Sequence, residues 1–296
     1  MRLADQAGAL AGVLTIVATP IGNLGDLSPR AIECLRQADV IYCEDTRHSG
    51  QLLKHAGIAA PALLSLHEHN ERERISGALD RLAAGESLAL ISDAGTPLVC
   101  DPGALLLDAA IEAGFVVSIV PGPSAVVAAV VLSGIAGERW RFEGFLPRKT
   151  ARRAELLSEI ASAPHASVIY EAPHRLERTL SELVASCGQE RQVALVRELT
   201  KLHEEVWRGS LKDALAHSEQ VAPRGEYVIV VAADQRPPSS SAHDLGAAID
   251  SLLAAGLSKR DAISALEVLT GVSHRAAFEA AHLPTGGAVE VERSRE

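Results

Sequence analysis

The stretch that most constrains the fold of this chain runs from Leu88 to Gly103 and reads LALISDAGTPLVCDPG. An apolar segment typical of a strand stops at Ser92, a loop rich in glycine and proline follows, and an apolar helical pattern begins at Ala104. A strand, such a loop and a helix place a ligand at the carboxyl end of a strand in an open α/β sheet. The loop is longer than most connections of this kind, so we interpret it as a binding loop.

The same order of strand, loop and helix recurs through the first half of the chain. Short apolar strands are expected at 13–18, 40–43, 63–66, 88–91 and 115–120. Their alternation with helical patterns predicts a mainly parallel sheet with right-handed crossovers. One helix start is explicit, because Ser28 precedes Pro29 as an N-cap precedes the first helical residue. We therefore expect an N-terminal α/β domain over residues 13–122.

Residues 123–233 predict a second α/β domain. Helical patterns alternate there with apolar segments. After the apolar segment that ends at Glu198, a polar stretch without a strand or helix pattern continues to Arg208. Its strands are expected at 140–145, 167–170, 192–198 and 227–232. We find no internal sequence repeat.

The rest of the chain has a different composition. The run DQRPPSSS is typical of a linker, which we place at 234–242. Residues 243–284 predict a small helical domain, in which Ser258 and Ser273 have the position of N-caps. We expect flexible tails where no core pattern occurs, at 1–12 and 285–296.

Composition limits the partners. The net charge of −10 argues against a protein that binds nucleic acid by bulk electrostatics, and we expect no DNA partner. No apolar run reaches the roughly 18 residues of a membrane span, and the N-terminus has no signal-peptide layout, so we expect no membrane partner. The four cysteines form no CxxC pair, which predicts reduced thiols and a cytoplasmic protein.

Several loops follow the carboxyl ends of predicted strands. These loops are 19–25, 44–47, 67–70, 92–103 and 121–125. They converge at one edge of a parallel sheet, so we expect them to build one cleft. None has the form GxGxxG, and Gly22 and Gly25 alone are weak support for phosphate binding. Asp45 lies about where a ribose-binding acid would, which keeps a nicotinamide-dependent enzyme as an alternative.

Polar residues in these loops have two interpretations each. His67 and His69 have the spacing of a metal pair, but no third ligand is evident, and we expect no metal. Glu44 and Asp45 fit a general base and fit helix N-terminal carboxylates about equally well. The basic run that ends at Arg153 is usually a solvated face, but next to a cleft it is also the best candidate for phosphate contacts.

The loops together resemble the tetrapyrrole-methylase superfamily and, within it, the bacterial branch that methylates small-subunit ribosomal RNA. The matching segments lie between residues 13 and 233 and read ATPIGNLGDLSPRA, CEDTRHSGQLLKHAGI, LHEHNE, ISDAGTPLVCDPG, VPGPSA, EGFLPRK, YEAPHR and RELTKLHEE. The resemblance implies a two-domain α/β fold with S-adenosylmethionine (SAM) in the interdomain cleft, and a homodimer. It also implies methylation of a cytidine ribose 2'-hydroxyl in the decoding region of 16S rRNA, in the small ribosomal subunit.

The resemblance also assigns residues to the site. The SAM-lining positions it implies are Pro20, Thr96, Leu98, Val99, Ser124, Ala125 and Tyr170. The signature polar positions are Glu44, Asp45, Arg47, His69 and Asp93. Arg47 and the basic run are then hypothesised RNA contacts, with the run contributing Arg148, Lys149, Arg152 and Arg153. Where cobalamin and porphyrin enzymes of the superfamily often carry Gly-Asp-Pro, this chain has Gly-Thr-Pro at 95–97, which suits the RNA branch.

Methyl transfer to a ribose hydroxyl needs alignment and a proton acceptor. The reaction is an in-line displacement at a sulfonium carbon, so positioning supplies much of the rate. The hydroxyl is a weak acid, and a carboxylate or histidine takes its proton. We expect Glu44 and Asp45 to do so with His69 nearby, whereas Asp93 either faces the hydroxyl or caps its own loop. The alternatives are a methylase of a tetrapyrrole-type small molecule and a ribosome-binding module that has lost catalysis.

Overall fold

The structure is a computed structural model that describes residues 12–59, 62–148, 150–234, 242–270, 272 and 274–282. The chain divides into two compact units, residues 1–234 and residues 235–296. Of the predicted tail 1–12, only Gly12 is described, and its buried N–H donates to the carbonyl of Leu82. Of the predicted linker 234–242, residues 235–241 lie outside the described residues, as does the predicted tail 285–296, whereas Ala242 already belongs to a helix.

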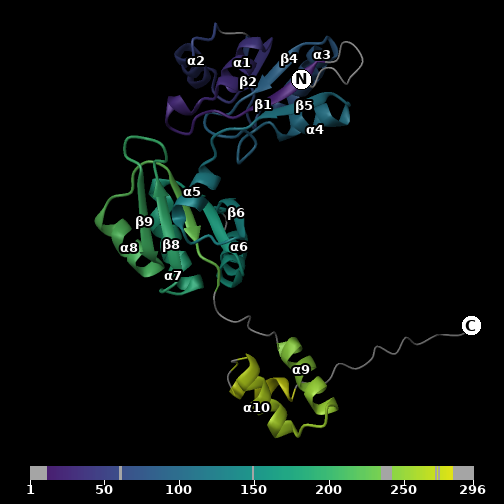
Figure 1. The fold of residues 1–296 in the computed structure, drawn as a ribbon, viewed down its shortest axis with the longest axis vertical. Coiled ribbons are helices and arrows are strands. Elements are labelled where there is room, and N and C mark those ends of the chain that lie inside the picture. The colour runs from purple at the N-terminus through teal and green to yellow at the C-terminus, as the bar shows by residue number, and fades with distance from the viewer. Residues whose placement is uncertain are drawn as a thin grey trace, which may run out of the picture. The chain divides into compact units, whose positions relative to one another are not determined.

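Sheet A is a parallel sheet of five strands in the order β3-β2-β4-β1-β5 (Figure 1). Its strands are β1 (Val13–Val17), β2 (Val40–Cys43), β3 (Ala62–Ser65), β4 (Ser87–Leu90) and β5 (Val116–Val120). Four helices connect them, α1 (Pro29–Gln37), α2 (Thr46–His55), α3 (Glu71–Ala83) and α4 (Ala104–Glu112). The predicted parallel α/β fold is confirmed.

Alternating side chains of sheet A pack into two separate cores. Leu14 of β1 faces α3 and α4, whereas Val17 faces α1 and α2. Because helices cover both faces, each strand is apolar almost throughout, as expected of a parallel sheet. Ser28 Oγ accepts the N–H of Ala31 at 3.1 Å, which confirms the predicted N-cap of α1.

The strand order places a topological switch point between β1 and β4. These two strands are neighbours, but the chain leaves β1 for α1 on one face and leaves β4 for α4 on the other. Ligands of open α/β sheets bind outside the carboxyl ends of the strands at such a point. The loop after β4 is the stretch around Gly95, so the fold puts it where a ligand is expected.

Sheet B is mixed, with the order β6-β7-β10-β8-β9. Its strands are β6 (Trp140–Phe145), β7 (Ala166–Glu171), β8 (Gln192–Arg197), β9 (Glu205–Ser210) and β10 (Tyr227–Val231). Only β6 and β7 pair in parallel. Strand β9 falls within the predicted polar stretch, and that prediction is wrong. An edge strand whose residues are mostly exposed or half-buried carries too weak an apolar pattern to be recognised.

Helices cover both faces of sheet B. They are α5 (Ala125–Ser133), α6 (Thr150–Ser162), α7 (Leu176–Cys187) and α8 (Leu211–Gln220). Helices α6, α7 and α8 pack on one face, and α5 packs on the other. Ile21 and Val99, from the loops of sheet A, join the core on the α5 side. The prediction of a domain boundary between 122 and 123 stays a prediction.

The second compact unit is helical. It contains α9 (Ala242–Ala254), α10 (Lys259–Thr270) and α11 (His274–Ala280) around a small apolar core. Ser258 Oγ accepts the N–H of Asp261 at 3.2 Å, as an N-cap does, whereas Ser273 lies outside the described residues. No helix in the described part of the chain is long and apolar enough to cross a membrane.

Candidate functional site

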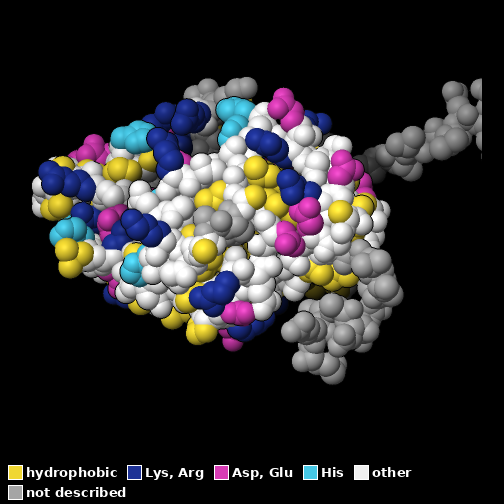
Figure 2. Space-filling model, turned by 90° about the horizontal axis from the view of Figure 1, so that it is seen from above, with side chains coloured by type: hydrophobic (Ala, Val, Ile, Leu, Met, Phe, Trp, Pro, Cys, Tyr) yellow, Lys and Arg dark blue, Asp and Glu magenta, His cyan; other side chains and the backbone are white. Residues whose placement is uncertain are grey.

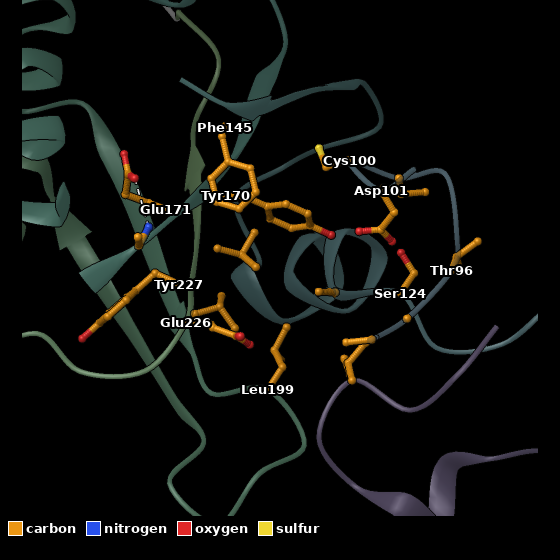
Figure 3. Close-up of a pocket in the computed structure, with 18 of the residues that line it drawn as sticks. Thr96, Cys100, Asp101, Ser124, Phe145, Tyr170, Glu171, Leu199, Glu226 and Tyr227 are labelled. Carbon is orange, nitrogen blue, oxygen red and sulfur yellow. Dashed lines mark hydrogen bonds between the residues drawn. The ribbon is translucent and has the colours of Figure 1, made fainter. Parts of the chain in front are cut away.

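A cavity of about 370 Å³ lies where the loops at the carboxyl edge of sheet A meet the α5 side of sheet B (Figure 3). Its walls are mainly apolar, with a few carboxylates and hydroxyls. The lining residues from the first half are Ile21, Ala94, Gly95, Thr96, Val99, Cys100, Asp101, Ser124 and Ala125. Those from the second half are Phe145, Tyr170, Glu171, Ala172, Pro173, Val196, Leu199, Glu226, Tyr227 and Val228.

Hydrogen bonds tie together the three loops of sheet A that reach the cavity. Thr19 N donates to Gly95 O at 2.8 Å, and Gly95 N donates back to Thr19 O at 3.2 Å. The Thr19 hydroxyl also donates to Ser92 O at 3.2 Å. Thr96 Oγ1 donates to Pro123 O at 3.0 Å. The loops after β1, β4 and β5 therefore form one wall.

The backbone of the loop after β4 adopts conformations that side chains rarely tolerate. Leu98 has φ 71° and Cys100 has φ 70°, both in the left-handed region. Gly103 has φ 118°, and a Cβ atom there would lie 2.6 Å from Leu90 Cδ2. These turns present Val99 and Asp101 to the cavity, at a cost of about 1–3 kcal/mol for each strained residue.

The loop after β8 clasps the loop after β1. Asn23 N donates to Thr200 Oγ1 at 3.0 Å. Gly22 lies so close to this loop that a Cβ atom would be 2.4 Å from Lys201 Cγ and 2.8 Å from Leu199 O. Leu199 lines the cavity. This contact joins the two halves of the first unit beside the cavity.

Five of the seven SAM-lining positions implied by the resemblance line this cavity: Thr96, Val99, Ser124, Ala125 and Tyr170. The other two do not. Pro20 is buried directly after β1. The Leu98 side chain packs against the core between sheet A and helices α3 and α4. Of these two positions, Leu98 still shapes the wall through its backbone.

The polar positions chosen from the sequence lie beside the cavity but do not line it. Asp45 caps α2, accepting from Arg47 N at 2.8 Å and pairing with its guanidinium at 3.0 Å. These bonds lower the pKa of Asp45 to about 2. Asp93 accepts the N–H of Asp45 at 3.3 Å, so the carboxylate of Asp93 holds the loop that follows β2. Glu44 and His69 are exposed, and burial together with Asp93 raises the pKa of Glu44.

Asp101 is the carboxylate of the same loop that does line the cavity. Burial raises the pKa of Asp101 to about 6, with Glu44 and Asp93 adding to the shift and a hydrogen bond from Ser92 opposing it. Figure 3 shows the Tyr170 hydroxyl pointing toward the Asp101 carboxylate. Burial, followed by Cys100 and Asp101, raises the pKa of Tyr170 to about 12. The sequence placed Asp101 in the binding loop but gave no signal that it, rather than Asp93, faces the cavity.

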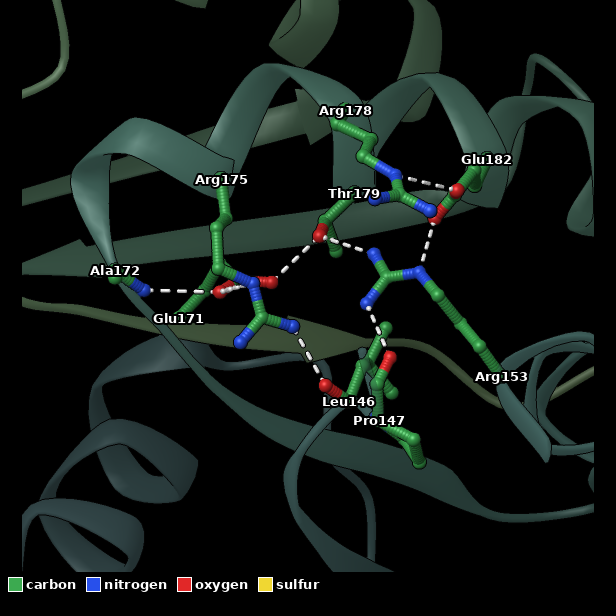
Figure 4. Close-up of polar contacts among 9 residues, drawn as sticks. All are labelled: Leu146, Pro147, Arg153, Glu171, Ala172, Arg175, Arg178, Thr179 and Glu182. Carbon is green, nitrogen blue, oxygen red and sulfur yellow. Dashed lines mark hydrogen bonds and ion pairs between the residues drawn. The ribbon is translucent and has the colours of Figure 1, made fainter. Parts of the chain in front are cut away.

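A saturated ion network supports the opposite wall (Figure 4). Glu171 Oε2 accepts from Thr179 Oγ1 at 2.5 Å, and Glu171 Oε1 pairs with Arg175 Nε at 3.2 Å. Arg153 donates to Thr179 Oγ1 at 2.7 Å and pairs with Glu182 at 2.5 Å. The network joins α6 and α7 to the end of β7, where Glu171 lines the cavity.

The predicted RNA contacts separate into exposed and buried residues. Arg47, Arg148 and Arg152 are exposed. Arg153 is only 3% exposed, and its guanidinium is occupied by Glu182, Thr179 and Pro147 O. Its assignment to an RNA-contacting surface is therefore wrong. Arg153 lies at the basic start of α6 beside the exposed Arg152, but its side chain is buried against α7, where it completes the ion network. Lys149 lies outside the described residues.

Basic side chains do not form one continuous patch on the face that Figure 2 shows. Lys and Arg occur there in separate groups, with Asp, Glu and apolar side chains between them. This distribution agrees with the net charge of −10. Any contact with a polyanion on this face depends on a few positioned cations rather than on a broad basic field.

His67 and His69, which have the spacing of a metal pair, lie close together in the structure. The rings of His67 and His69 lie with centroids 6.1 Å apart in an edge-on arrangement. Within the described residues, no group of three or more His, Cys, Asp or Glu side chains could hold a metal ion. His67 Nδ1 is buried without a hydrogen-bond partner in this part of the chain.

Known structures share the fold. The methyltransferase CobJ superposes with a TM-score of 0.59 at 21% identity, over 76% of this chain and 95% of that one. A uroporphyrin-III-C-methyltransferase from Thermus thermophilus gives a TM-score of 0.52 at 21% identity, over 75% and 94% of the two chains. At this level of identity the similarity establishes the architecture alone.

Sequence similarity is far higher to a set of curated relatives, each named ribosomal RNA small subunit methyltransferase I. The relative from Synechocystis sp. is 44% identical over 90% of this chain and 96% of its own length. That from Pseudomonas aeruginosa is 43% identical over 92% and 97%, and that from Xylella fastidiosa strain Temecula1 is 51% identical over 76% and 83%. The model of the Tetrapyrrole (Corrin/Porphyrin) Methylases matches residues 13–215. The chain therefore belongs to the tetrapyrrole methylase family and, within it, to the group of ribosomal RNA small subunit methyltransferase I proteins.

Proposed function

We propose that this protein is a SAM-dependent rRNA methyltransferase that modifies the ribose 2'-hydroxyl of a cytidine in the decoding region of 16S rRNA. The observation that carries the proposal is similarity of 43–44% identity over nine-tenths of the chain to small-subunit rRNA methyltransferases. The small-molecule methylases that share the fold are only 21% identical, which makes them the weaker guide to the substrate.

The cavity has the properties that SAM requires. Its volume of about 370 Å³ falls in the range of about 300–1,000 Å³ that is usual for small-ligand sites. Val99, Ala125 and Leu199 offer apolar surface to an adenosine. SAM is a cation, and the described residues that line the cavity include carboxylates but no lysine or arginine. The residues present therefore fit the methyl donor.

Each wall then has a task in methyl transfer. Bound SAM supplies a methyl group on a positively charged sulfur, which a hydroxyl oxygen can displace. The bonded loops around Gly95 and Pro123 hold the cavity in one shape, so the donor is fixed before the nucleophile arrives. The ring of Tyr170, which packs against Phe142 and Phe145, gives the site an apolar wall. We propose a reaction without a metal, because displacement at a sulfonium carbon requires only alignment and a proton acceptor.

The RNA contacts that we propose are the exposed arginines near the site. Arg148 follows β6, whose last residue Phe145 lines the cavity. Arg152 lies in the first turn of α6 and pairs with Glu155 at 3.0 Å, and Arg47 pairs with Asp45. These surface pairs are weak, so a phosphate can replace either carboxylate. The substrate we propose is the small ribosomal subunit in the cytoplasm.

We also propose a homodimer. Helix α5 presents Val127 and Val131 to solvent, with 52% and 72% of their surface exposed. Both lie on one side of the helix, four residues apart. Apolar residues gathered on a helix face are typical of a protein–protein interface. Sedimentation of the wild-type protein and of Val131→Asp tests this: we expect the substitution to yield monomers.

The function is tested by mapping ribose methylation. Small subunits from a strain that lacks this protein are incubated with the purified protein and SAM, and 2'-O-methyl groups are located by their resistance to alkaline cleavage. We expect one new methyl group, on a cytidine of the decoding region. Free 16S rRNA in a parallel reaction distinguishes naked RNA from the assembled subunit as substrate.

Two results would contradict the proposal. A protein that binds SAM but leaves the rRNA unmodified would favour a small-molecule methylase. A protein that binds small subunits but has no measurable affinity for SAM by calorimetry would be a ribosome-binding module without catalysis.

A further inference from the structure

Three carboxylates line the cavity, and two of them are paired with cations. Glu171 is held by Arg175 and by the hydroxyl of Thr179. Glu226 pairs with Lys201 at 3.0 Å. The bonds to Glu171 occupy its lone pairs, whereas the Glu226 side chain is 80% exposed, so water surrounds most of it.

Asp101 is the third carboxylate, and its surroundings are the opposite. No ion pair to Asp101 occurs among the residues that the structure describes, and the charged groups that act on it, Glu44 and Asp93, are both acidic. It lies in the wall built by the loop after β4, where the neighbouring Cys100 has a strained backbone. Figure 3 shows its carboxylate directed to the same space as the hydroxyls of Ser124 and Tyr170.

From this geometry we infer that Asp101 is a catalytic residue, the acceptor of the proton from the hydroxyl that is methylated. The inference rests on the proposed function, because it requires a hydroxyl nucleophile and a sulfonium methyl donor in this cavity. It replaces Glu44 and Asp45, which the sequence had favoured. Asp45 is engaged by Arg47 and neither residue lines the cavity.

The step balances without any further reactant. As the hydroxyl oxygen forms its bond to the methyl carbon, the O–H bond breaks and the proton moves to the Asp101 carboxylate. The carbon–sulfur bond of the donor breaks and its electron pair stays on sulfur, which turns the sulfonium into a neutral thioether. Asp101 afterwards releases the proton to water.

The environment of Asp101 sets the pH range in which it accepts a proton. The groups that face it are Ser92 and Asp93 of its own loop, Cys100 beside it, Glu44 after β2 and Tyr170 of β7. Burial and the two acidic neighbours raise its pKa to about 6. Asp101 is therefore ionised at neutral pH, yet it is a stronger base than an ordinary aspartate.

The test compares Asp101→Asn with a matched control, Asp108→Asn, in full-length protein. Asp108 is an exposed aspartate on α4, seven residues further along the chain. Two quantities are measured: the SAM dissociation constant by calorimetry, and the single-turnover rate of methylation of small subunits from pH 5 to pH 9.

We expect Asp101→Asn to lower the rate by about 10²–10⁴-fold, the usual contribution of a general base, with SAM affinity kept within about threefold. The wild-type rate should rise about tenfold per pH unit up to about 6 and then level off, a profile that Asp101→Asn lacks. Asp101→Glu keeps a carboxylate and should restore part of the rate with a shifted midpoint, and it replaces Asp101→Asn as the test if that variant does not fold. Asp108→Asn should behave as wild type.

Several outcomes would overturn the inference. They are an unchanged rate in Asp101→Asn, loss of SAM binding together with the rate, an unchanged pH profile in Asp101→Glu, or a large loss in Glu44→Gln alone. If the wild-type protein itself transfers no methyl group to small subunits, the proposed function fails first, so the two failures are distinguishable.

Discussion

The two walls of the cavity each contain a buried or half-buried carboxylate, and they treat it in opposite ways. In the wall from sheet A, Asp101 stands among acidic neighbours on a loop with strained backbone. In the wall from sheet B, Glu171 is held by Arg175 and Thr179 in a network with Arg153. In the second wall every charged group of the network has a bonding partner, which stabilises the wall. In the first wall an unpaired, reactive carboxylate lowers the stability of the folded protein.

Removing the central cation of the second wall should have the largest effect on stability. Arg153→Ala leaves Glu182 and Thr179 without their buried partner, and we expect a loss of about 3 kcal/mol in the free energy of unfolding. Urea denaturation measures it. Arg152→Ala is the matched control, since Arg152 is an exposed neighbour whose removal should change stability by less than about 0.5 kcal/mol. Equal losses in the two variants would mean that the network does not support this wall.

Filling the strained turn of the first wall should come next. Gly103→Ala places a Cβ atom 2.6 Å from Leu90 Cδ2 at φ 118°, so we expect a loss of about 2 kcal/mol and weaker SAM binding. In the control Gly114→Ala, φ is also positive but no atom lies within 4 Å. That variant should lose only about 1 kcal/mol and bind SAM normally. The measurements are thermal unfolding and calorimetry, and unaltered SAM affinity in Gly103→Ala would contradict the role of this turn.

Neutralising Asp101 should stabilise the protein while it slows methylation. In the folded chain its pKa is about 6, above the roughly 3.9 of an unfolded aspartate, so between these values the folded state binds the proton more tightly. The free energy of unfolding therefore falls as pH rises from about 4 to about 6 and is constant above. Asp101→Asn lacks this loss and should be about 1 kcal/mol more stable at pH 7.5, after allowance for partial exposure, but not at pH 4. Lower stability of Asp101→Asn at pH 7.5 would break the contrast between the walls.

The smallest effect should follow from loosening one hydrogen bond within the first wall. Thr96→Val removes the donor to Pro123 O, and we expect a loss of about 0.5 kcal/mol and a modest decrease in SAM affinity. Thr96→Ser keeps the hydroxyl and should bind SAM as the wild type does. If valine and serine have the same effect, the methyl packing of Thr96 matters rather than its hydrogen bond.

The sequence was sufficient for the parts of the fold that rest on strong local patterns. The strands of sheet A are mainly apolar because helices cover both faces of the sheet, and the loop around Gly95 is marked by residues with unusual backbone freedom. Strand β9 was missed because an edge strand is only half-buried. A local sequence pattern predicts a strand but not the strands it pairs with. The mixed parallel and antiparallel pairing of sheet B could therefore not be predicted either.

The candidate site was predictable to the level of loops but not of individual carboxylates. Thr96, Ser124 and Tyr170 reach the cavity as the family resemblance implied. Which acid faces the cavity depends on the left-handed backbone conformations of Leu98 and Cys100. Leucine and cysteine rarely adopt this conformation, so the sequence alone does not predict it. Arg153 likewise looked like its neighbour Arg152, and only the packing of α6 on α7 distinguishes them.

The clasp between Asn23 and Thr200 has a consequence for the order in which this protein matures on the ribosome. It joins residues 177 positions apart, and the cavity is completed by Val228 of β10. Sheet A and its four helices can bury their own cores once residue 120 has emerged from the ribosome. The nascent chain at that stage has a folded half but an open ligand site, so methyl-donor binding reports the last stage of assembly and stabilises only the finished enzyme.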